Sequence, residues 1–525
     1  MDAPRPRGIV VFGGGTATNS LVDVFESIRE SRNCHLSYVI PISDNGGSSS
    51  ELIRVFGGPG IGDIRSRLVR LIPGSDTDAE RASIKDLFNH RLSSDPLQAR
   101  LQWLEIVEGR DELWTNISSE KRELIRSVFN LVNLEIVKRA RPSSVFNFSK
   151  ASIGNLFLTG ARVFTGSLES AIYLLSTICA IPPTVSTLPV INTNFTHHIS
   201  AGLADGTQIT GQNSISHPSA PTSLPDDNDD PSSSSSSLGN GGGGSSDETE
   251  EHDRIEDATL PGSLPTLRKP YINFSKTTTT TAATTSPSSS STTNTGTAEA
   301  YHDDDLPARI SRIWYINPYG HEIFPPASAK VLSAVRAARA VVYSVGSLYT
   351  SIVPSLVPRG VGAALSAADG SGGGGGGPRF KVLILNSAND RETGPRAAPL
   401  TATDFVRAVA RAAAGSGGSG SSGNSSSNSR GDREIVVTDD DERSTRSAED
   451  EAVRRYVTHL VYLEGEGAPR VDRDELAALG VDCIRVYGRR VDGMLRYDEA
   501  GLARALEAVI GKPEMLRSRR NTSGQ

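Results

Sequence analysis

Short apolar runs alternate with segments of helical periodicity over most of the 525-residue chain. The run Gly8-Ile9-Val10-Val11-Phe12 has strand character, and residues 19–29 then carry apolar side chains at helical spacing. The same alternation predicts strands at 38–42, 184–189, 340–344, 381–385, 458–463 and 482–486, and helices at 50–56, 64–72, 151–164, 168–179, 328–338, 348–353, 403–413, 474–479 and 499–510. Such alternation favours an α/β fold with a Rossmann-like, doubly wound, mostly parallel sheet.

Two segments depart from that alternation. Residues 82–140 are helical in character throughout, with a break expected around 108–111, and they indicate a helical excursion from the sheet. Short strands are predicted at 196–201 and 208–210, and strand character then resumes only at 310–316. We therefore expect a hairpin that a long insertion interrupts.

Three low-complexity segments interrupt the pattern, at about 213–305, 370–378 and 414–451. They are rich in Ser, Thr, Gly or Asp, and such compositions bury too little apolar surface to offset the entropy lost on ordering. We expect disordered insertions in surface loops, where closure entropy grows slowly with loop length. About 385 residues remain without them, which suits a single α/β domain spanning residues 1–525.

The net charge of −7 comes largely from one segment. Residues 222–260 hold eleven acidic side chains and one basic side chain, a local charge of −10. The remainder lacks the basic, aromatic-interleaved surface of nucleic-acid-binding proteins, so no nucleic-acid partner is expected. Three widely spaced cysteines argue against disulfides and thiolate metal sites. No apolar run reaches eighteen residues, so a cytoplasmic protein without membrane contact is expected.

The first candidate site is the turn Gly13-Gly14-Gly15-Thr16, which directly follows the first predicted strand. Such turns in open α/β sheets bind phosphorylated ligands, because free backbone N–H groups and the dipole of the next helix favour anions. Thr18 stands where the dinucleotide-binding fingerprint has its third glycine, so that motif is incomplete. The turn predicts a phosphate cradle, or alternatively a turn that needs glycine only for positive φ.

A polar loop, Asp44-Asn45-Gly46-Gly47-Ser48, follows the second predicted strand. A carboxylate beside a carboxamide, two glycines and hydroxyls suit a hydrated divalent cation held together with phosphate oxygens. The alternative is an Asx turn whose serines cap the next helix.

Three later helix starts also carry polar side chains. Asp63 and Arg65 follow a glycine-rich loop and are site candidates, with a helix-capping aspartate and a solvated arginine as the alternative. Ser152 and Asn155 open another helix, where serine is also a routine cap. A second strand-to-helix turn contains Gly346, Ser347 and Tyr349; it is a candidate for another phosphate or a sugar, with an ordinary tight turn as the alternative.

Taken in order, these blocks resemble the motifs of the CofD/YvcK superfamily, whose core is a Rossmann-like α/β domain. The chain departs from that pattern at Ala17, Asn45 and Ala151, where Gly, Asp and His are usual, and has Ser344-Val345 in place of Gly-Pro. Phosphate contacts made by backbone N–H groups survive such changes, whereas chemistry that needs a second carboxylate is put in doubt. The matching blocks are GGGTAT (Gly13 to Thr18), SDNGGSSS (Ser43 to Ser50), GDIRSRL (Gly62 to Leu68), SIGNLFL (Ser152 to Leu158) and SVGSLYTSI (Ser344 to Ile352).

The resemblance implies two functions. YvcK-like proteins bind nucleotide-diphosphate sugars and regulate carbon metabolism, and the GGSSS and GDIR blocks are similar to that branch. CofD-like members are transferases that move a phospholactyl group from a guanosine-diphosphate-linked donor to a deazaflavin with a divalent metal, so enzymatic activity stays open. A Rossmann oxidoreductase is disfavoured by Thr18, and no NAD(P) requirement is expected.

The resemblance also implies roles for individual residues. Asp44 and Asp63 are the expected catalytic carboxylates and the expected ligands of Mg²⁺. The expected partner is a nucleotide-diphosphate-linked small molecule; its base, its sugar or acyl group and the oligomeric state stay open, with a homo-oligomer among the alternatives. The expected ligand-binding residues are Gly13, Gly14, Gly15, Thr16, Asn45, Gly46, Gly47, Ser48, Arg65, Ser152, Asn155, Gly346, Ser347 and Tyr349.

Overall fold

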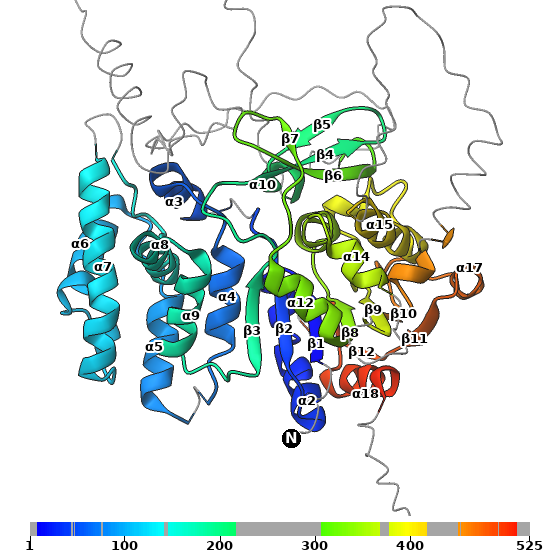
Figure 1. Ribbon diagram of the computed structural model, residues 1–525, viewed down its shortest axis with the longest axis horizontal. Coiled ribbons are helices and arrows are strands. Elements are labelled where there is room, and N and C mark those ends of the chain that lie inside the picture. The colour runs from blue at the N-terminus through cyan, green and yellow to red at the C-terminus, as the bar shows by residue number, and fades with distance from the viewer. Residues whose placement is uncertain are drawn as a thin grey trace, which may run out of the picture.

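The computed structural model (Figure 1) describes residues 8–43, 46, 48–74, 77–140, 145–216, 306–367, 377–416, 450–451, 453–491 and 493–511. Most of each predicted insertion lies outside these ranges. Two helices reach a few residues into the first and third of them: α10 (Gln212–Ser216) and α15 (Ala402–Gly415). The boundaries predicted at 213 and 414 are therefore a few residues early.

A seven-stranded parallel sheet forms the centre of the fold, as predicted. The strand order is β11-β10-β9-β8-β1-β2-β3. The chain builds outward from β1 to β3 and later returns to build from β8 in the other direction, which puts a topological switch point between β1 and β8. The strands are β1 (Gly8–Phe12), β2 (Leu36–Ile40), β3 (Val185–Pro189), β8 (Ala338–Tyr343), β9 (Phe380–Ile384), β10 (His459–Tyr462) and β11 (Asp482–Arg485).

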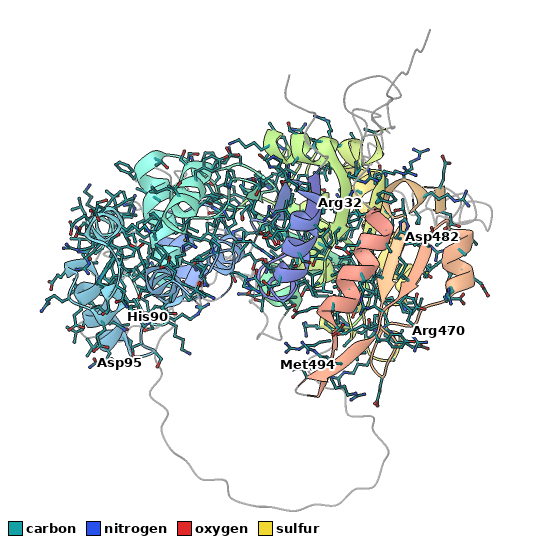
Figure 2. All side chains as sticks on the ribbon, turned by 90° about the horizontal axis from the view of Figure 1, so that it is seen from below. Arg32, His90, Asp95, Arg470, Asp482 and Met494 are labelled. Carbon is teal, nitrogen blue, oxygen red and sulfur yellow. The ribbon has the colours of Figure 1, made fainter. Side chains whose placement is uncertain are left out.

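Apolar side chains of the central strands alternate between two hydrophobic cores, because successive strand residues point to opposite faces. Ile9 and Val11 belong to the core that α2 (Val22–Arg32) and α18 (Glu499–Ile510) cover, whereas Val10 and Phe12 belong to the other. Figure 2 shows α2 and α18 side by side, with Arg32 on α2. The second core packs against α12 (Ala329–Ala337), α13 (Val353–Leu356), α14 (Val361–Ser366), α15 and α17 (Arg473–Ala478).

The predicted helical excursion forms a block of helices beside the sheet (Figure 1). It contains α5 (Ala79–Asn89), α6 (Pro96–Glu108), the short 3₁₀ helix η1 (Glu112–Trp114) and α7 (Ser119–Arg139), followed by the helix pair α8 (Ile153–Thr165) and α9 (Leu168–Ile178).

The break predicted around 108–111 in this block is present, but reading 82–140 as otherwise continuous helix was wrong. A second break separates α5 from α6, where His90 and Asp95 are labelled in Figure 2. Asp95 accepts a hydrogen bond from the Gln98 N–H (2.8 Å) and Pro96 occupies the first helical position, which together start a new helix.

A four-stranded sheet lies across the end of the central sheet at which the strands finish (Figure 1). Its order is β5-β4-β6-β7, with β4 (His198–Leu203), β5 (Gln208–Thr210), β6 (Ile310–Ile316) and β7 (Glu322–Ile323). Strand β6 pairs antiparallel with β4. Antiparallel pairing across the long insertion is therefore confirmed, although β6 pairs with β4 and not with β5, the strand directly before the insertion.

The remaining elements include one hairpin that the sequence pattern did not predict. It consists of β12 (Gly488–Val491) and β13 (Met494–Tyr497), whose residues are mostly exposed and carry little apolar pattern.

The remaining helices carry candidate site residues or their immediate partners. They are α1 (Thr16–Asn19), α3 (Ser48–Phe56), α4 (Gly62–Arg70), the π-helix η2 (Leu348–Ile352) and the 3₁₀ helix η3 (Arg391–Thr393). Among the described helices, none combines the length and apolar character needed to span a bilayer.

Candidate functional site at the sheet switch point

Two strand-to-helix turns meet where β1 and β8 end side by side. The N–H of Ser344, directly after β8, donates to the carbonyl of Phe12 at the end of β1 (2.9 Å). Thr18 then joins the two turns, because its Oγ1 donates to the carbonyl of Val345 (3.0 Å). In open α/β sheets the crevice at such a switch point is where ligands bind. The Gly13 and Gly346 turns, predicted separately, thus lie side by side at this switch point.

The glycines of the first turn are required by close contacts. None of Gly13, Gly14 and Gly15 has a positive φ, so the alternative based on φ alone is wrong. A Cβ atom on Gly15 would lie 2.4 Å from Asp63 Oδ1, and one on Gly14 would lie 2.8 Å from Ser351 Oγ. The turn is therefore packed directly against the carboxylate of α4 and against the second turn.

The first turn keeps two backbone donors free for a ligand. Gly14 and Gly15 are buried, yet their N–H groups donate to no group that the structure describes. Buried backbone N–H groups are nearly always paired, so two unpaired donors in one turn suit an anionic ligand. The helix dipole that was expected to favour an anion contributes little here, because α1 is a single turn of four residues.

Asp63 and Arg65 both lie in the first turn of α4, but they do not follow the alternative interpretation. The N-cap of α4 is Ile61, with no side-chain capping bond, so Asp63 is not the helix cap. Arg65 is only 8% exposed. It donates to Asn89 Oδ1 (3.1 Å) and to Asn155 Oδ1 (3.4 Å). The alternative of a solvated arginine is therefore wrong.

The Arg65–Asn155 contact brings together two blocks that lie 90 residues apart. Gly154, between Ser152 and Asn155, allows that approach, because a Cβ there would lie 2.7 Å from Arg65 Cγ. Ser152 precedes α8 without capping it through its side chain, and its buried Oγ has no hydrogen-bond partner among the described groups. Capping therefore does not explain Ser152.

The second turn is held by side chains that the sequence pattern did not single out. Gly346 has φ of +139°, so a tight turn does require glycine there. Asn386 holds both sides of it: the Gly346 N–H donates to Asn386 Oδ1 (3.0 Å), and Asn386 Nδ2 donates to the Gly346 carbonyl (2.8 Å). Asn386 follows β9 and therefore lies at the same edge of the sheet. Its position after a predicted strand was the signal for it.

Glu392 organises the start of η2. Its Oε2 accepts from the N–H groups of Tyr349 (2.9 Å) and Thr350 (3.1 Å), and its Oε1 accepts from the Thr350 hydroxyl. The Tyr349 hydroxyl donates to the carbonyl of Ile310 (3.1 Å) in the four-stranded sheet. Both donors of Tyr349 thus have protein partners, and this residue braces the turn. Ser347 remains half-exposed at its edge.

The loop before α4 is clamped from two sides. Arg162 of α8 donates to the carbonyl of Gly57 (2.7 Å). Thr196, just before β4, accepts from the Gly58 N–H (3.2 Å) and donates to the Gly58 carbonyl (2.9 Å). These contacts hold in place the loop that leads into α4 and therefore to Asp63.

Part of the predicted site falls outside the described residues. Asp44, Asn45 and Gly47 lie there, and only the backbone of Ser48 is described, as the first residue of α3. Gly46 is half-buried, and its carbonyl accepts from the Ser49 N–H (3.1 Å). Among the described residues no group of three or more His, Cys, Asp or Glu side chains is placed to hold a metal. The predicted Asp44–Asp63 metal site stays a prediction.

The raised pKa of Glu392 should make the free energy of unfolding depend on pH. Burial, together with the nearby Asp390, raises the pKa of Glu392 to about 8. The folded chain therefore holds a proton that the unfolded chain releases above its ordinary pKa of 4.5. The unfolding free energy should accordingly fall as the pH rises toward 8, by at most about 1.4 kcal/mol per pH unit. Urea unfolding at several pH values measures this slope.

Glu392→Gln is the variant that tests this assignment. The slope should become smaller in the variant, leaving the part due to Asp390, whose pKa burial also raises. An unchanged slope would show that Glu392 does not carry the extra proton.

Similarity to known proteins places the chain in a family. Residues 9–486 match the family model described as 2-phospho-L-lactate transferase CofD. The chain is 40% identical over 389 residues to the uncharacterized protein YNL011C of Saccharomyces cerevisiae, covering 73% of this chain and 79% of that protein. Two crystal structures of protein BH3568 from Bacillus halodurans, one described as a member of the UPF0052 family, share the fold at a TM-score of 0.50. They are 17% and 18% identical and cover 96% and 97% of this chain, and 99% and 100% of theirs. The extent of the family match and the yeast relative together show that this chain belongs to the CofD family.

Proposed function

We propose that this chain binds a nucleotide-diphosphate-linked metabolite of the nucleotide-sugar class at the switch point between β1 and β8, as a regulator of carbon metabolism in the cytoplasm. The observation that carries the proposal is the pair of unpaired N–H groups of the buried residues Gly14 and Gly15. A phosphate group would accept from both, and backbone donors recognise phosphate without regard to the rest of the ligand.

Buried, unpaired hydroxyl groups at the end of β8 and at the start of α8 are compatible with the same ligand. The hydroxyl of Ser344 is completely buried at the end of β8 and has no hydrogen-bond partner among the described groups. The Oγ of Ser152 is in the same situation at the start of α8. Polar groups left unpaired in a folded chain cost stability, and a bound ligand or ordered water offsets that cost.

Asp63 gives a reason to expect a divalent cation with the phosphates. Its carboxylate lies against the peptides of Gly14 and Gly15 and would face any phosphate bound there. A carboxylate and a phosphate held at the same turn repel one another unless a cation lies between them. Mg²⁺ prefers such oxygen ligands, so we assign it to Asp63 with Asp44.

A transferase of the CofD type is the second candidate, and the description of the matched family model favours it. The two candidates share the phosphate site and differ in turnover. The transferase requires Mg²⁺-dependent transfer of a phosphorus-containing group from a nucleotide-diphosphate-linked donor. The regulator requires binding without product.

Thermal-shift screening distinguishes these candidates. The purified full chain is screened against nucleotide-diphosphate sugars, UDP, GDP, NAD(P)H and Mg²⁺, and each ligand that raises the Tm is then incubated and examined for product. A ligand that binds only the folded state raises the Tm by mass action. A shift with a nucleotide sugar and no product supports the regulator, and Mg²⁺-dependent turnover supports the transferase. No shift with any phosphorylated compound would contradict both.

Asp63→Asn should weaken binding of the nucleotide diphosphate in the presence of Mg²⁺ by about tenfold or more, a loss of about 1.4 kcal/mol. The variant keeps the shape of the side chain and removes the charge that would hold the cation. Calorimetric titration with and without Mg²⁺ measures the effect. Equal affinity of the variant and the native chain in Mg²⁺ would remove Asp63 from the site.

A further inference from the structure

Arg67, on the inner side of α4, lies directly behind the phosphate turn. Its side chain is completely buried. Nη2 donates to the carbonyl of Gly14 (2.9 Å), and the guanidinium lies over the ring of Tyr38, 4.3 Å from its centre. Solvation was the alternative interpretation for the arginines of this helix, and Arg67 is not solvated.

Arg67 forms no ion pair with a described carboxylate, although Asp63, four residues earlier on α4, lies near enough to favour its charged form. Its Nε and Nη1 make no hydrogen bond with the described residues. Burial lowers the pKa of Arg67 to about 10, so the side chain is still charged at neutral pH. Arg70, three residues further along the same helix, pairs instead with Asp23 at the surface (2.5 Å). An unpaired buried cation costs stability, and a bound anion nearby would offset that cost.

The hydrogen bond to Gly14 also determines where a backbone donor points. The structure contains no cis peptide among its described residues, so the C=O of Gly14 and the N–H of Gly15 point in opposite directions across one planar peptide. Because Arg67 holds the carbonyl, the Gly15 N–H is directed away from the Arg67 guanidinium. This N–H is one of the two unpaired donors of the turn.

We propose that Arg67 is a positioning residue for a phosphate-bearing anion: it orients the Gly14–Gly15 peptide toward the ligand and supplies the positive charge behind it. The inference rests on the proposed phosphate site and deepens it. The site takes a diphosphate as a dianion or trianion whose charge Arg67 partly neutralises, although the guanidinium does not touch it. Neutralisation through one peptide is effective because the surroundings are buried and screen charge weakly.

Inorganic pyrophosphate is the probe that isolates this contribution, because it has no base or sugar. Its affinity is measured by calorimetry for the native full chain, Arg67→Met, Arg67→Lys and the surface control Arg70→Met, together with the Tm of each. Arg67→Met should lose about tenfold or more in affinity. Arg67→Lys should recover part of that loss, because the ammonium keeps the charge and one donor. Arg70→Met, which changes the net charge equally, should stay within about twofold.

The outcomes separate this inference from the proposed function. If the native chain binds pyrophosphate and folded Arg67→Met binds it equally well, the positioning role is wrong while the phosphate site stands. If the native chain binds no phosphorylated compound, the proposed site itself is wrong. If Arg67→Met does not fold, Arg67→Lys decides: a purely structural role lowers the Tm and leaves the pyrophosphate-induced rise in Tm unchanged, whereas the positioning role reduces that rise.

Discussion

Gly15→Ala is expected to lower the affinity for a nucleotide diphosphate by about 100-fold or more, equivalent to about 2.8 kcal/mol. The backbone of Gly15 has φ of −77° and ψ of −73°, which alanine accepts, so strain in the turn is not the cause. The added Cβ would lie 2.4 Å from Asp63 Oδ1 and 3.1 Å from Asp63 Cα. The turn must move away from α4, and the two free N–H groups then lose their orientation. Calorimetric titration of the variant measures the loss.

The chain should survive this substitution. Overpacking costs typically about 1–3 kcal/mol, less than the stability of most domains. Gly415→Ala is the matched control, because no heavy atom lies within 4 Å of the Cβ it would add, at the end of α15. The control should bind as the native chain does. Binding by folded Gly15→Ala within about threefold of the native chain would show that the ligand does not use this turn.

Gly362→Ala should destabilise the folded chain more than either Gly15→Ala or Gly415→Ala. A Cβ on Gly362, in α14, would lie only 1.9 Å from the carbonyl oxygen of Ala413 in α15 and 2.7 Å from Ser416 Oγ. It would also displace Ser416, whose hydroxyl accepts from the Gly362 N–H (2.7 Å). Because the nearest atom is backbone, the two helices must separate. The unfolding free energy should fall by about 3 kcal/mol or more.

Urea denaturation of Gly362→Ala beside Gly415→Ala tests this expectation. The control adds the same methyl group to the neighbouring helix in open space, so it should be neutral or slightly stabilising. A loss below about 1 kcal/mol in Gly362→Ala would mean that α14 and α15 do not pack as closely as described.

Much of the fold could be predicted because its strands are buried on both faces. Continuous apolar runs such as 340–344 and 381–385 identified strands β8 and β9 within two residues. A hairpin was predicted across the interrupting segment because strand character resumed after it, but the pattern did not reveal that β6 pairs with β4. The exposed β12–β13 hairpin has no buried face, and its residues leave little pattern to detect.

The predicted helices were wrong where hydrogen bonds from particular side chains, rather than the spacing of apolar residues, determine the structure. The break before α6 had a clear signal in Asp95-Pro96, which the helical periodicity on either side obscured. The helix predicted at 348–353 is a π-helix over Leu348–Ile352. Glu392 of η3 accepts hydrogen bonds from the N–H groups of Tyr349 and Thr350, and no local pattern reveals such a contact.

The candidate site was predictable where it contains glycine-rich turns and polar residues at the start of a helix. Gly14, Gly15, Asp63 and Arg65 were identified from the sequence and lie around one end of α4. Arg67 was missed for the opposite reason. A charged residue in an amphipathic helix is most often solvated, and only tertiary packing against Tyr38 shows that this one is buried.

A crystal structure with a bound nucleotide diphosphate tests the central claim most directly. The ligand would be the compound that raises the Tm most in the thermal-shift screen, supplied together with Mg²⁺. The account predicts its phosphates between the β1 and β8 turns, within hydrogen-bonding distance of the N–H groups of Gly14 and Gly15. Phosphates bound elsewhere, with these two N–H groups still unpaired, would contradict it.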